Sequence, residues 1–99
     1  MSMDKQVMLL RQYYLNEIDR IYEHRFQMRL MAVLLFDQNR FTNKLKSIET
    51  ISSIIERACV DCNPKRMMKY IIVLKKAIDD LVEKTDKDYK KMWDDKLTH

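Results

Sequence analysis

The sequence contains no glycine in 99 residues, and Pro64 is its only proline. An average domain carries roughly 7 % glycine and 5 % proline, and these residues form most tight turns and strand corners. The abundant Leu, Ile, Met, Lys, Arg, Asp and Glu lose little rotamer freedom in a helix. The composition therefore predicts an all-α protein with two short connections.

Other absences narrow the function. Phosphate-binding and dinucleotide-binding loops require glycines, so both motifs are excluded. The longest apolar run, from Leu30 to Phe36, is far shorter than the ~20 residues of a membrane span, so we expect no membrane partner. With two cysteines and no visible signal peptide, we expect a reducing compartment, either cytoplasm or nucleus. The opening Met1-Ser2-Met3 also fits a domain excised from a longer protein.

Apolar residues recur at helical spacing in three segments, and they predict helices near residues 4–36, 43–62 and 64–97. We expect one domain over residues 1–99, an antiparallel three-helix bundle whose first helix is too long for the second to cover. Such a bundle could also dimerise. The expected core positions of the second helix are Leu45, Ile48, Ile51, Ile55, Ala58 and Cys62, and those of the third are Met67, Ile71, Leu74, Ile78, Leu81 and Val82.

Local signals predict where these helices begin. Asp37 to Arg40 is the first candidate break, after which Thr42 can cap the second helix. Asn63 followed by Pro64 is typical of an N-cap and the first helical residue. Thr85-Asp86 either caps a separate short helix or lies within one continuous third helix.

The first helix carries two apolar stripes separated by arginines. The first stripe would close the bundle and contains Val7, Leu10, Tyr14, Ile18, Ile21 and Met28. The second contains Met8, Leu15, Tyr22 and Phe26, and the arginines between the stripes are Arg11, Arg25 and Arg29. An arginine beside apolar surface must pair or extend to water. The arginines could therefore pair with Glu49 or Glu56, line an interface, or bind an anion such as phosphate.

Two features resemble reactive sites only superficially. Cys59 and Cys62 form a CxxC at the end of the second helix, where the helix dipole does not stabilise a thiolate. A structural zinc site needs about four ligands, and only His24 and His99 could be added, so we expect reduced cysteines and no metal. No serine or cysteine nucleophile motif accompanies His24, so it has no group to activate as a catalytic base. We therefore expect a rim histidine, no cofactor and no enzyme activity.

The start of the third helix is basic. Lys65, Arg66, Lys69 and Lys76 lie close together on it, and they could contact phosphates of a nucleic acid. A solvated surface is the simpler interpretation, because Asp79, Asp80 and Glu83 follow and no aromatic side chains alternate with the lysines. The net charge of +4 is below that of a dedicated nucleic-acid arm.

The second stripe carries the main functional hypothesis. Helices two and three can hardly cover Met8, Leu15, Tyr22 and Phe26 as well as the first stripe, and soluble monomers rarely expose large apolar patches. We therefore expect a non-enzymatic interaction module, most simply a coiled-coil-like homodimer, otherwise a subunit bound to a helical partner. Nucleic-acid binding through the third helix is the alternative.

Overall fold

The computed structural model describes residues 4–34 and 38–97, and the side chains at positions 4–24 and 42–95. It contains α1 (Lys5–Leu34), α2 (Gln38–Val60) and α3 (Pro64–Leu97). Within the described ranges there is no strand, and the prediction of an all-helical bundle is confirmed. None of the described helices is long and apolar enough to span a membrane.

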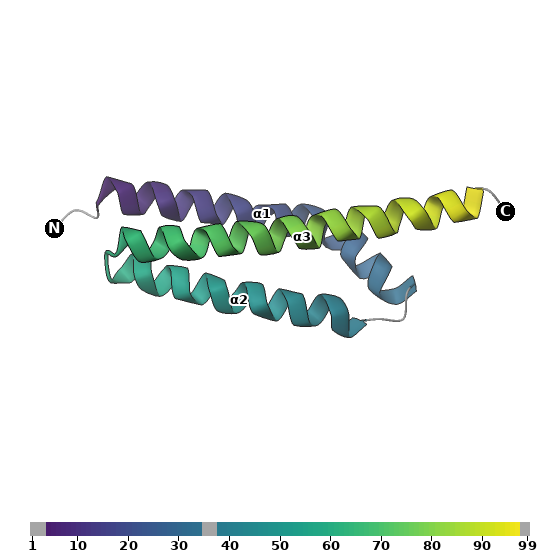
Figure 1. The fold of residues 1–99 in the computed structure, drawn as a ribbon, viewed down its shortest axis with the longest axis horizontal. Coiled ribbons are helices and arrows are strands. Elements are labelled where there is room, and N and C mark those ends of the chain that lie inside the picture. The colour runs from purple at the N-terminus through teal and green to yellow at the C-terminus, as the bar shows by residue number, and fades with distance from the viewer. Residues whose placement is uncertain (1–3, 35–37, 98–99) are drawn as a thin grey trace.

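The helices form an elongated bundle of 63 × 21 × 18 Å (Figure 1). Figure 1 shows α1 and α3 running in the same direction, with α2 returning beside them. The last turns of α1 pass behind α3 and bend towards the start of α2. The C-terminal end of α3 extends beyond the end of the bundle at which α2 begins.

One apolar core joins the three helices. Its central side chains have no more than 2 % of their surface exposed: Val7 from α1, Ile55 from α2, and Met67, Ile71, Leu74, Ile78 and Leu81 from α3. Ile18, Ile21, Leu45, Ile51, Tyr89 and Met92 pack around it. The core positions predicted for α3 are therefore confirmed.

Side-chain caps begin two of the helices. The Asn63 Oδ1 atom accepts a hydrogen bond of 3.1 Å from the backbone N–H of Arg66, as predicted for an N-cap. The Asp4 Oδ1 atom accepts one of 2.9 Å from the backbone N–H of Gln6. Asp4 thus caps α1 instead of being its first helical residue.

The predicted start of α2 is wrong. The helix begins at Gln38, so Thr42 lies inside its second turn and is not the cap. The helical pattern continues upstream because Phe41 stands four residues before Leu45 and seven before Ile48. Positions 35–37 lie outside the described residues, so the predicted extension of α1 to residue 36 and the role of Asp37 are not described.

The end of α2 also differs from the prediction, because the helix stops at Val60. Cys62 adopts a left-handed backbone conformation with φ of 51°. The Asn63 N–H then bonds the carbonyl of Ala58 at 2.9 Å, and the Cys62 N–H bonds that of Cys59 at 3.0 Å. This is the Schellman pattern, which usually places glycine in the left-handed position. A chain without glycine uses a cysteine there, and Cys62 is consequently exposed outside the core.

α3 continues without a break through Thr85. The Thr85 side chain is buried, and its Oγ1 donates a hydrogen bond of 2.8 Å to the carbonyl of Leu81. The hydroxyl is therefore satisfied inside the helix, which is why threonine does not start a new helix here.

Candidate protein-interaction surface

Charged contacts between α1 and α3 fix how the two helices are aligned. Arg20 Nη1 lies 2.7 Å from Glu17 Oε2 on its own helix and 2.5 Å from Asp79 Oδ1 on α3. One turn further along α1 and two turns further along α3, His24 Nε2 lies 3.7 Å from Asp86 Oδ1. The Nδ1 atom of His24 is 2.9 Å from the carbonyl of Arg20, which orients the ring. Arg20 and Asp79 are therefore at the same height along the bundle.

This alignment brings four exposed apolar side chains together. Tyr13 stands seven residues before Arg20, and Ile72 stands seven before Asp79, so both lie two turns below the ion pair on the same side. Leu9 and Met68 follow one turn below them. The exposed fractions are 72 % for Leu9, 45 % for Tyr13, 43 % for Met68 and 63 % for Ile72. We call these four residues the α1–α3 face.

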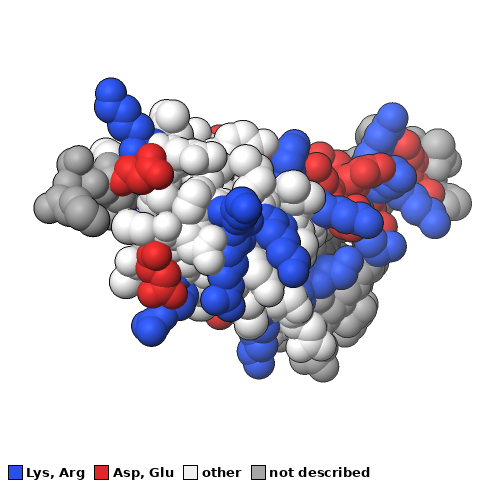
Figure 2. Space-filling model, turned by 60° about the vertical axis from the view of Figure 1, so that its left-hand side comes forward, with Lys and Arg blue, Asp and Glu red and all other residues white. Residues whose placement is uncertain are grey.

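The parts of α1 and α3 that carry the α1–α3 face are basic. Residues 5–16 of α1 and residues 64–78 of α3 contain no carboxylate. Lys5 lies one turn from Leu9, and Lys65 and Lys76 lie one turn from Met68 and Ile72. In Figure 2 the middle of the view shows blue side chains over white surface, whereas red and blue side chains crowd the C-terminal end at the right.

The second stripe predicted from the sequence is only partly uncovered. Met8 and Tyr22 are exposed, with fractions of 56 % and 65 %. Leu15 is half-buried and packs against the core. The Phe26 side chain lies outside the described residues. The expectation that the neighbouring helices cannot cover this stripe is therefore wrong at Leu15.

The arginines between the stripes pair within the chain where they are described. Arg11 Nη2 lies 3.4 Å from Glu56 Oε1 of α2, so one of the two predicted carboxylates is the partner. Both side chains are more than one-third exposed, and such pairs contribute about 0–1 kcal/mol. The Arg25 and Arg29 side chains lie outside the described part of the chain.

Glu56 also accepts a hydrogen bond from the Tyr14 hydroxyl. Tyr14 is 3 % exposed. Its burial, followed by the hydrogen bond to Glu56 and the charge of that carboxylate, raises the pKa of Tyr14 above its ordinary range. The neutral phenol is thus held between α1 and α2, where Arg11 opposes the shift only partly.

This shift predicts an alkaline loss of stability. Unfolded Tyr14 loses its proton from about pH 10 upward, whereas the folded phenol keeps it, so the unfolded state binds fewer protons. The free energy of unfolding should then fall with rising pH by up to about 1.4 kcal/mol per unit from this group. Urea titrations between pH 8 and 11 should show a shallower fall for Tyr14→Phe. Tyr22→Phe, which removes an exposed hydroxyl, is the control; equal slopes for all three proteins would contradict the prediction.

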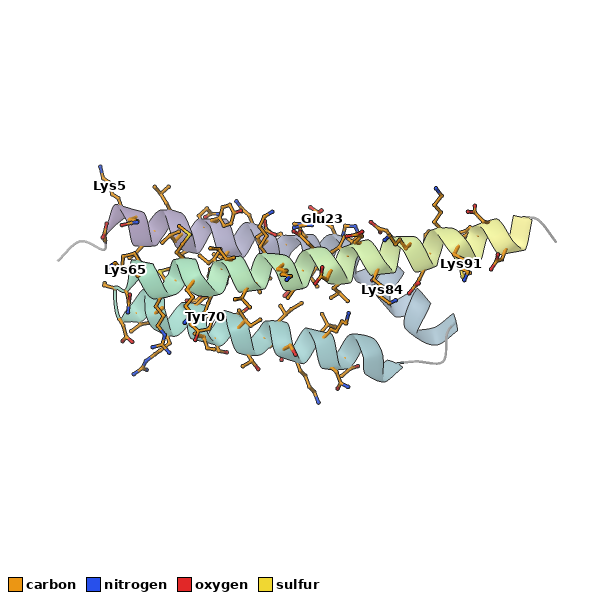
Figure 3. All side chains as sticks on the ribbon, in the orientation of Figure 1. Lys5, Glu23, Lys65, Tyr70, Lys84 and Lys91 are labelled. Atoms are coloured by element: carbon orange, nitrogen blue, oxygen red, sulfur yellow. The ribbon has the colours of Figure 1, made fainter. Side chains whose placement is uncertain are left out.

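The basic start of α3 has the exposure that the nucleic-acid alternative needs. Lys65, Arg66, Lys69 and Lys76 are all exposed, and none is in an ion pair with a described carboxylate. The sequence pattern gave no signal for Tyr70, whose ring centre lies 5.9 Å from the Arg66 guanidinium carbon and 5.7 Å from Lys69 Nζ. Figure 3 shows Tyr70 on the side of α3 that faces α2. It packs against the core and is poorly placed to stack on a base.

Within the part of the chain that the structure describes, the reactive residue types do not assemble into a site. Cys59 is buried, Cys62 is exposed, and both thiols are free. Among the described residues no three His, Cys, Asp or Glu side chains are grouped as a metal site would require. His24 contacts the backbone carbonyl of Arg20 and the Asp86 carboxylate, which suits a helix-to-helix contact.

No protein-family model matches the sequence, and no curated protein or solved structure matches it well enough to indicate a relationship. We therefore infer the function from the surface of the bundle itself.

Proposed function

We propose that this chain is a non-enzymatic assembly module, an antiparallel three-helix bundle that associates with another copy through the α1–α3 face. The observation that supports the proposal is the grouping of Leu9, Tyr13, Met68 and Ile72, all exposed, on two adjacent helices. Contiguous apolar surface of this kind commonly marks an interaction site. Because the two helices run side by side in the same direction, they present these side chains together to a further helix.

The proposal differs from the sequence prediction in where the interface lies. Leu15 packs against the core, which divides the stripe of Met8 and Tyr22. The α1–α3 face is undivided and takes residues from two helices. Aromatic and methionine side chains, which are enriched in interface cores, make up half of it.

The test compares the two surfaces directly. Sedimentation equilibrium of the wild-type chain should give a mass approaching two chains at high concentration. Leu9→Lys/Ile72→Lys should raise the dissociation constant by about 100-fold or more, because two desolvated apolar contacts become charges. Met8→Lys/Tyr22→Lys makes the same chemical change on the other surface and should leave the dissociation constant within about threefold.

Circular dichroism must show unchanged helix content in both variants, since every substituted residue is exposed. A wild-type chain that stays monomeric at millimolar concentration would contradict self-association. Dissociation by Met8→Lys/Tyr22→Lys alone would return the interface to the stripe predicted from the sequence.

Nucleic-acid binding is the second candidate, supported by the four exposed cations at the start of α3 that lack a described carboxylate partner. Binding of a labelled duplex should then weaken steeply between about 50 and 200 mM salt. Lys69→Gln should reduce both the affinity and its salt dependence. Retention of a chain–chain complex at the higher salt, without duplex binding at the lower, would favour assembly.

A further inference from the structure

The charges of α3 divide the helix into two unlike halves. Residues 64–78 hold five Lys and Arg and no carboxylate, whereas residues 79–95 hold seven carboxylates and four lysines. Isolated helices gain nothing from such a division, because the attractive pairs on a helix lie only three or four residues apart. The two halves are complementary to each other only when two copies of α3 meet in opposite directions.

Opposite charges also fall on one line along the helix. Eleven residues are close to three helical turns, so positions eleven apart are almost in line. Lys65 and Lys76 are eleven apart, and so are Ile72, Glu83 and Asp94. Ile72 belongs to the α1–α3 face, and Lys76 and Glu83 are exposed on the same side. Glu83 forms an ion pair of 3.2 Å with an exposed neighbour on the same helix, Lys87.

We propose that the second copy packs its α3 antiparallel to that of the first, about a two-fold axis passing between Asp79 and Asp80. Lys65 then faces Asp94 of the second copy, and Lys76 faces Glu83 of the second copy. This arrangement rests on the proposed self-association and specifies the geometry of the dimer. Because a two-fold contact uses the same surface of both copies, two copies satisfy it, and it gives a dimer and not a filament.

The same arrangement brings Trp93 of the second copy to the α1–α3 face. Trp93 of the second copy comes within about 3 Å, along the axis, of the height of Met68, at 1.5 Å per residue. Trp93 is 44 % exposed and lies edge-to-face against Tyr89, with ring centres 6.1 Å apart. Trp93 and Met68 lean towards the same side of α3, so the indole of the second copy lies over Met68 and Leu9. A large aromatic in a groove is a common interface anchor.

An arrangement in which the acid-free halves of two copies overlap is disfavoured by charge. If the two acid-free halves met, Lys65, Lys69 and Lys76 would face the same residues of the second copy. Like charges brought together across an interface are strongly unfavourable. Near the proposed axis, Asp79 is already paired within each copy with Arg20 and with Lys75.

Complementary charge reversal tests the geometry. The first variant is Lys65→Glu/Lys76→Glu and the second is Glu83→Lys/Asp94→Lys. Each variant alone should dimerise about 100-fold more weakly than wild type, because four cross-copy attractions become repulsions. An equimolar mixture should form a heterodimer with a dissociation constant within about fivefold of the wild-type value, since every pair is then opposite in charge. Sedimentation equilibrium measures the dissociation constants of the two variants and of their mixture.

Arg66→Glu/Lys84→Glu is the matched control, because it makes the same change in net charge on another side of α3. It should dimerise like wild type, and circular dichroism checks the fold of each variant. A wild-type dimer whose mixed variants do not recover affinity would overturn the antiparallel geometry and leave the proposed function standing. A monomeric wild type would overturn both.

Small-angle scattering of the wild-type dimer gives a measurement that needs no variant. Because the two α3 helices overlap along their whole length, the dimer should be about as long as one bundle, whose long dimension is 63 Å. A dimer markedly longer than one bundle would contradict the overlap.

Discussion

Replacing Leu74 with alanine should lower the free energy of unfolding by about 3 kcal/mol, the largest effect that we expect from one substitution. Leu74 is fully buried in the middle of α3, within the core that joins the three helices. Truncation removes apolar contacts and leaves a cavity that the long, straight helices can close only partly, and such changes cost about 2–5 kcal/mol. Urea unfolding followed by circular dichroism measures the loss.

Ile72→Ala is the matched control, two residues away on the same helix. Ile72 is 63 % exposed, so its truncation should change the free energy of unfolding by no more than about 0.5 kcal/mol. Similar losses for the two variants would mean that the core side of α3 is incorrectly assigned. The two variants also separate the effect on stability from the effect on assembly, because Leu74 lies in the core and Ile72 belongs to the α1–α3 face.

The sequence predicts the core of α3 well because the helix is long and its apolar spacing is regular. Apolar residues share one side of the helix at intervals of three and four, at Met67, Ile71, Leu74 and Ile78. Nothing in the local sequence competes with that pattern. The second helix is predicted less well at its ends. Cys62 fits the apolar spacing, but the turn to α3 needs a left-handed residue there, so Cys59 occupies the core instead.

The α1–α3 face could not be predicted from periodicity within one helix. Leu9 and Tyr13 lie one turn apart on a side of α1 that otherwise looks polar, and Met68 and Ile72 look like the edge of α3. Whether those two sides meet depends on which side of α1 each neighbouring helix takes. Contacts between distant residues decide this, above all Arg11 with Glu56 and Arg20 with Asp79. The equal spacing of the two apolar pairs was the available signal, and it becomes meaningful only once the helices are aligned.

Arg20 is the residue on which that alignment depends, and its loss should have the second largest effect. Glu17 is only 9 % exposed, and Arg20 is the cation that it contacts. Hydrogen bonds to Asp79 and then to Glu17 hold the pKa of the Arg20 guanidinium above its ordinary value, so both carboxylates stabilise its charge. Arg20→Met keeps most of the aliphatic stem but leaves Glu17 buried without its cation.

We therefore expect Arg20→Met to lower the free energy of unfolding by about 2 kcal/mol, chiefly through the desolvation of Glu17. Asp79→Asn should cost less than about 1 kcal/mol, because Asp79 is partly exposed and Arg20 still has Glu17. The double variant Glu17→Leu/Arg20→Met should recover most of the loss, since a buried charge pair can be replaced by apolar side chains at little cost. Urea unfolding of the wild type and the three variants measures these losses. If Arg20→Met lowers the free energy of unfolding no more than Asp79→Asn does, Arg20 does not stabilise the buried Glu17 carboxylate. The α1–α3 alignment is then held by the apolar core alone.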